Sequence, residues 1–145
     1  MDKKAIIWGL ATFAGLYVFH AVVIPFLVNI TDRNIVSGSL IWSLHQLLGL
    51  LTCVIAGFVS GYIAGDGGFK HGFVVGMLGT LLSAALASMM PISPVSSYPL
   101  GVKVVSWLMV NGAITGLAAV FGVTVAAKKN GAREGQNENN TDFRA

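Results

Sequence analysis

Four long apolar stretches make up most of the chain. They cover residues 5–31, 34–65, 71–102 and 104–127, and none of them contains Asp, Glu, Lys or Arg. Each is long enough to cross a hydrocarbon core about 30 Å thick, which needs roughly 20 helical residues. Backbone groups in lipid need hydrogen-bond partners within their own segment, and the alternating pattern of a barrel strand is missing, so the stretches predict helices. We expect helical spans over residues 5–28, 39–64, 71–92 and 102–127.

These spans predict an all-α fold, a four-helix transmembrane bundle with short loops. Residues 1–129 would form the membrane domain, and residues 130–145 a polar tail that cannot bury a core and is expected to be disordered. The apolar run from Ala5 to Val28 is longer than the apolar region of a signal peptide, so we interpret it as a retained anchor. The prolines near residues 91–99 predict an extended second outer loop.

Composition supports this class of protein and excludes a soluble monomer. The chain is 54% hydrophobic and 10% charged, whereas soluble domains carry about 25% charged residues. With a cytoplasmic N-terminus, seven of the nine Lys and Arg residues fall on the cytoplasmic side and two, Arg33 and Lys103, on the outer side. That bias predicts both termini inside. The isoelectric point near 9.3 therefore reflects topology, and we expect no nucleic-acid partner.

Small residues gather on one face of each of the last three spans, opposite Leu, Ile, Val and Phe. In lipid, helices associate through close van der Waals contact, which small residues allow, so these faces predict the helix contacts and the bulky faces the lipid surface. We expect the last three spans to form a tight core with the first packed outside it. The predicted packing residues are Gly49, Gly57, Gly61, Gly65, Gly72, Gly76, Gly79, Gly112, Gly116 and Gly122. The same faces could also serve a homo-oligomer or bind another membrane subunit.

Two ionisable residues, His20 and His45, lie within the spans, and such residues are functional candidates. Helical rise places them about 12 Å and about 9 Å inside the outer ends of their spans. Gln46 is adjacent, and Asn111 lies about 13 Å from the outer end of the fourth span. These four residues predict a polar layer in the outer third of the bundle. They could fix helix register through hydrogen bonds or form a solute or proton site.

A third interpretation of the two histidines is a haem b or copper site with His20 and His45 as ligands. Met89, Met90 and Met109 lie toward the same side and could supply thioether donors. An enzyme is not expected, because no span holds a carboxylate and no HExxH, GxSxG, P-loop or CxxC motif occurs. His71, next to Lys70, is interpreted as an interfacial residue.

The glycine-rich segment Gly57-Phe58-Val59-Ser60-Gly61-Tyr62-Ile63-Ala64-Gly65 is followed by His71-Gly72-Phe73-Val74-Val75-Gly76-Met77-Leu78-Gly79. This hairpin, about a fifth of the chain, resembles families of small four-helix prokaryotic membrane proteins of uncharacterised function. The resemblance implies a multi-pass protein of a bacterial or archaeal plasma membrane and carries over no catalytic residues. We therefore expect a non-enzymatic membrane protein. The alternatives are a small permease or channel component, and a bis-histidine haem or copper protein.

Overall fold

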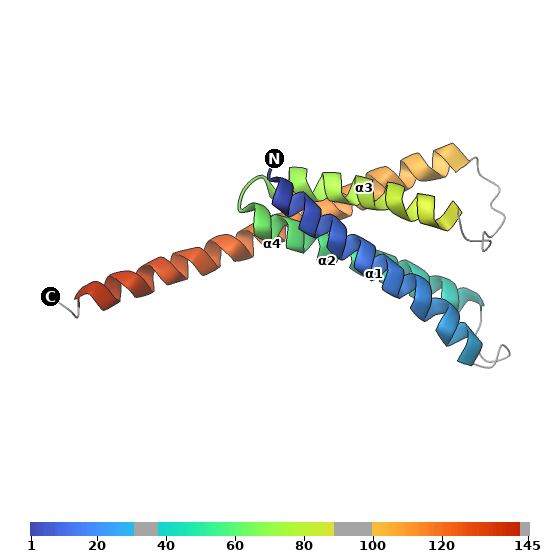
Figure 1. The fold of residues 1–145 in the computed structure, drawn as a ribbon, viewed down its shortest axis with the longest axis horizontal. Coiled ribbons are helices and arrows are strands. Elements are labelled where there is room, and N and C mark those ends of the chain that lie inside the picture. Colours follow the sequence, from blue (N-terminus) through green and yellow to red (C-terminus); the bar gives the residue numbers. More distant parts are fainter. Residues whose placement is uncertain (31–37, 89–99, 143–145) are drawn as a thin grey trace.

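The computed structural model describes residues 1–30, 38–88 and 100–142, and these residues form four helices (Figure 1). The helices are α1 (Lys3–Ile30), α2 (Gly38–Ala64), α3 (Gly68–Ser88) and α4 (Leu100–Asp142). No strand occurs among the described residues, and each helix is long and apolar enough to cross a membrane. The expected all-helical class is therefore confirmed, and the described residues include four helices long and apolar enough to be the expected spans.

Helix α3 begins at Gly68, three residues before its predicted start, because the turn after α2 is tighter than the sequence suggests. Gly65 ends α2 with a φ of +71°, and Gly67 has a φ of +53°. Both angles lie in the left-handed region that glycine enters without a steric penalty. The Lys70 amide then donates to the Gly67 carbonyl (3.1 Å) in the first turn of α3. The end of the predicted third span and the proline-rich loop lie outside the described residues.

The helices form two arms that cross and then separate (Figure 1). Helices α1 and α2 run side by side in one arm, and α3 and α4 in the other. Helix α4 packs on both α2 and α3, whereas α1 contacts α2 and α3 but not α4 within the described ranges. We call the region where the arms have separated the open end. It contains the C-terminal halves of α1 and α3. It also contains the N-terminal half of α2 and the N-terminal half of the membrane span of α4. The contacts agree with the expectation that the first span packs outside the other three.

Close backbone contact holds the crossing together. A Cβ atom added at Gly57 or Gly61 would overlap the carbonyl oxygen of Thr115 or Ala119 in α4. One added at Gly76 would lie 2.6 Å from the carbonyl oxygen of Asn111. Backbone atoms of α4 therefore occupy the space that side chains at these positions would fill, which is how small residues let membrane helices approach.

The remaining predicted packing glycines divide into three groups. Gly72 and Gly122 also meet backbone atoms of the neighbouring helix, while Gly79, Gly112 and Gly116 meet aromatic rings of Phe13, Phe73 and Phe69. Gly49 and Gly65 differ from the prediction, because a Cβ at either would have nothing within 4 Å. Gly65 belongs to the turn rather than to a helix contact, and Gly49 lies where the arms have separated.

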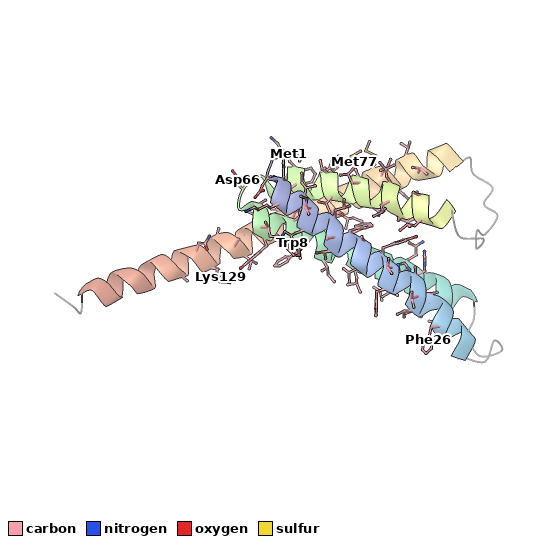
Figure 2. All side chains as sticks on the ribbon, in the orientation of Figure 1. Met1, Trp8, Phe26, Asp66, Met77 and Lys129 are labelled. Carbon is pink, nitrogen blue, oxygen red and sulfur yellow. The ribbon has the colours of Figure 1, made fainter. Side chains whose placement is uncertain are left out.

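Bulky side chains cover the outside of the bundle, as the apolar faces predict. Leu51, Ile55, Leu117 and Phe121 are all exposed, and Figure 2 shows side chains projecting outward along every arm. Trp8 and Phe26 of α1 are about 60% exposed in the same way (61% and 60%). Because apolar side chains of this size are costly in water, this surface suits a lipid surrounding.

Helix α4 continues through the polar tail as far as Asp142. Figure 1 shows this extension projecting away from the other helices. The span already supplies the costly helix nucleus, so helix can propagate into a following segment that contains good helix formers such as Ala132, Glu134 and Gln136. The tail therefore extends the chain beyond the bundle without adding to its core.

Candidate functional site

The two histidines of the spans lie against each other. His20 Nε2 of α1 and His45 Nδ1 of α2 are 2.8 Å apart, and the ring centroids are separated by 4.4 Å at an interplanar angle of 61°. His20 is buried, and Tyr17, one turn earlier, meets it edge-on at 6.0 Å between centroids. The sequence placed both histidines at one depth, and the structure joins them by a hydrogen bond across the α1–α2 arm.

The direction of this hydrogen bond follows from the other nitrogen of His20. His20 Nδ1 is buried without a hydrogen-bond partner among the described residues. An unsatisfied buried N–H is costly, because it has lost its bond to water, whereas a bare ring nitrogen leaves only a lone pair unused. We therefore infer that His20 carries its proton on Nε2 and donates it to Nδ1 of His45.

A second polar pair joins α3 to α4. Asn111 Nδ2 donates to Thr80 Oγ1 (3.0 Å), and the Thr80 hydroxyl donates to the Gly76 carbonyl one turn earlier (2.8 Å). Thr115 donates to the Asn111 carbonyl (2.6 Å). Each arm therefore has its own hydrogen-bonded pair of side chains, and such a pair contributes about 0.6 kcal/mol on average between membrane helices.

All four residues of the predicted polar layer line one cavity of about 550 Å³ at the open end. The walls come from all four helices, with His20 from α1, His45 and Gln46 from α2, and Asn111 from α4. Helix α3 contributes Thr80 and other small residues. The cavity exists because the two arms separate on the open-end side of the glycine contacts with α4. Gly49 lies there and has no atom of a neighbouring helix within 4 Å of its Cβ position.

The haem interpretation does not fit this geometry. Two axial nitrogens on opposite sides of an iron, each about 2 Å away, would lie about 4 Å apart with the metal between them. The two histidine nitrogens instead face each other at 2.8 Å, a hydrogen-bond distance. Within the described ranges no third His, Cys, Asp or Glu joins them to form a metal-binding group. Met89 and Met90 lie outside those ranges.

Several residues of the site were not predicted as site residues. Tyr17, Thr80, Ser83 and Trp107 all line the cavity, and the Tyr17 hydroxyl donates to the Ser83 carbonyl (3.3 Å). Thr80 and Ser83 lie on the small face of α3, so helix periodicity alone assigns them to packing. For Tyr17 the sequence did contain a sign of its place in the site. Tyr17 precedes His20 by one helical turn, so the two residues share one face of α1.

His71 is buried rather than simply interfacial, and it connects the N-terminal residue Asp2 to the turn between α2 and α3. The Asp2 amide donates to His71 Nε2 (2.7 Å), and His71 Nδ1 is 3.0 Å from the Gly67 carbonyl. In these contacts Nε2 accepts from the Asp2 amide and Nδ1 donates to the Gly67 carbonyl. His71 thus holds the start of α1 against the α2–α3 turn, at the opposite end from the cavity.

Comparison with protein-family models, with curated proteins and with solved structures gave no match for this chain. Its class therefore rests on the structure: four helices able to cross a membrane, compatible with a multi-pass membrane protein.

Proposed function

We propose that this chain is a non-enzymatic membrane protein that binds a small solute in the cavity at its open end. The observation that carries the proposal is the convergence of His20, His45, Gln46 and Asn111, from three helices, on one cavity. Polar groups in an apolar bundle cost free energy, and empty space forfeits van der Waals contacts. A bundle that served packing alone would gain from closing this region with apolar side chains, so the open polar cavity favours a binding role.

The setting we propose is a prokaryotic plasma membrane with both termini in the cytoplasm. The Lys and Arg distribution and the resemblance of the glycine-rich hairpin support it. The open end would then face the outer leaflet. The partners would be the lipid bilayer and a second copy or another membrane subunit.

The proposed topology predicts the behaviour of reporter fusions. A periplasmically active reporter joined after Arg33 or Lys103 should give a signal, and one joined after Lys70 or Lys129 should not. The reason is that basic residues near span ends are retained on the cytoplasmic side. The measurement is alkaline phosphatase activity normalised to expression. A strong signal from the Lys70 fusion would contradict the proposed orientation and indicate the opposite one.

Native mass spectrometry of protein extracted with its surrounding lipids tests solute binding. We expect a bound small molecule in the wild type that is lost in Gly49→Leu, because Gly49 borders the cavity and has open space around its Cβ position. Gly15→Leu is the matched control: Gly15 also has open space but does not line the cavity. The same spectra report the copy number. Retention of the molecule in both variants would contradict a cavity site.

A further inference from the structure

We propose that the ligand of this cavity is an uncharged amphiphile with a hydroxyl or carbonyl head group, and that it enters from the lipid rather than from water. This inference rests on the proposed function and names the class of molecule that the site accepts. It follows from the charge of the walls, from their division into polar and apolar parts, and from the position of the opening.

The walls carry no formal charge. None of the described residues that line the cavity is Asp, Glu, Lys or Arg. A charged ligand at membrane depth would lose its hydration without gaining a counter-charge, and that cost is several kcal/mol per ion. An uncharged molecule avoids the penalty, so the lining selects against ions and against ligands with carboxylate or ammonium groups.

The walls divide into hydrogen-bonding and apolar surfaces. His20, Gln46 and Asn111 supply the first, and Phe13, Leu50 and Ile114 contribute to the second. A ligand with one polar head and an apolar body can satisfy both, as in most small-molecule sites. The volume of about 550 Å³ admits a head group with a ring or a short chain but not a whole phospholipid.

His20 supplies an independent sign that a partner is missing. The residue is 4% exposed and borders the cavity, and its buried Nδ1 has no hydrogen-bond partner among the described residues. Buried polar atoms are normally paired. With its proton on Nε2, the ring keeps Nδ1 as an acceptor, and because this atom has almost no accessible surface, a ligand hydroxyl would reach it only after a small movement of the cavity wall.

The opening lies within the membrane spans. Leu50 of α2 and Trp107 of α4 line the cavity and are each 44% exposed. Both belong to the candidate spans Ser43–Ala64 and Val104–Ala132. Deeper in the bundle the same two helices are in backbone contact at Gly57 and Gly61, so they separate only toward the open end (Figure 1). Acyl chains would surround such an opening, and a ligand would reach it by lateral diffusion in the bilayer.

Trp107 provides a local probe for the test. In the full chain, Trp8→Phe and Trp42→Phe leave Trp107 as the single tryptophan, and bromine quenches indole fluorescence at short range. The protein is reconstituted in phosphatidylcholine vesicles and titrated with three probes of equal chain length: ω-bromoundecanol, ionised ω-bromoundecanoate and bromoundecane. Excess unbrominated undecanol measures the part of the quenching that is saturable and displaceable, as opposed to simple partitioning.

We expect displaceable quenching with bromoundecanol only. Gly49→Leu should weaken it about tenfold or more, and Gly15→Leu should change it by less than about twofold, because only the first fills the cavity. If Gly49→Leu does not fold, Ala84→Leu replaces it as the cavity-filling variant, because it adds bulk to the cavity wall on α3. Displacement by undecan-2-one in place of undecanol would show that the site accepts a carbonyl head group, and displacement by undecanol alone would show that it requires a hydroxyl.

The outcomes separate this inference from the proposed function. Displaceable quenching by bromoundecanoate equal to that by bromoundecanol would overturn the uncharged class, as would a bound molecule in the native mass spectra that is ionic or insoluble in lipid. In both cases a solute site would remain. If no probe gives displaceable quenching and the spectra show no bound molecule, the inference and the proposed function fall together.

Discussion

Gly61→Leu is expected to cause the largest loss of stability among single substitutions of the described glycines. A Cβ at this position would overlap the carbonyl oxygen of Ala119 and come within 2.7 Å of its Cα. These are backbone atoms of α4, which cannot rotate away as a side chain can, so the helices must separate. Overpacking of a core costs about 1–3 kcal/mol, and we expect more than about 3 kcal/mol here because backbone must move. Reversible unfolding in mixed micelles, followed by circular dichroism, measures the change.

Gly15→Leu is the matched control for this substitution. It adds the same side chain to a helical glycine of α1 that has nothing within 4 Å of its Cβ position. The loss of glycine and the gain of apolar bulk are therefore the same, and only the contact differs. We expect a change within about 0.5 kcal/mol of the wild type, as is usual for surface positions. Equal effects at Gly61 and Gly15 would show that α2 and α4 do not meet as described.

Gly79→Ala is expected to destabilise the protein by about 1–3 kcal/mol, and Phe13→Leu in the same chain should recover part of that loss. The Cβ of an alanine at Gly79 would lie 2.7 Å from ring atoms of Phe13, which docks α1 on α3. Here the obstacle is a side chain rather than backbone. Exchanging the ring for the smaller leucine removes the overlap, so the two changes should not be additive.

A double-mutant cycle in the same micelle assay measures this coupling. We expect the double variant to be more stable than the sum of the single effects predicts, by about 1 kcal/mol, as is typical for residues in contact. Phe73→Leu is the control partner, because Phe73 lies next to Gly112 and not Gly79. Additive effects of Gly79→Ala and Phe13→Leu would contradict the docking of α1 on α3.

The contrast between Gly49 and Gly57 shows which helix contacts a sequence pattern can predict and which it cannot. Both glycines lie on the small face of α2, and periodicity assigns both to helix packing. In the structure Gly57 touches the backbone of α4, whereas Gly49 borders the cavity. A helical period specifies which face a residue occupies but not how far along that face the neighbouring helix stays in contact. That distance depends on the angle at which the arms separate.

The polar residues make the same point at the candidate site. Helical rise predicts their depth in the membrane, because all four lie at countable distances from the ends of the predicted spans. Their pairing did not, since His20 with His45 and Asn111 with Thr80 are contacts between different helices. Thr80 carried no signal of its own, because small hydroxyl residues occur at packing and binding positions alike. His71 was misjudged for a related reason: its partner, Asp2, is distant in the sequence.

The sequence by itself determined the helical class, the number of spans and the bulky and small faces of the helices, because each depends on local hydrophobicity and the helical period. The tertiary structure alone decided which glycines touch backbone, which polar groups pair, and that a cavity opens between the arms. Those features depend on crossing angles between helices, which arise from contacts among residues far apart in the chain.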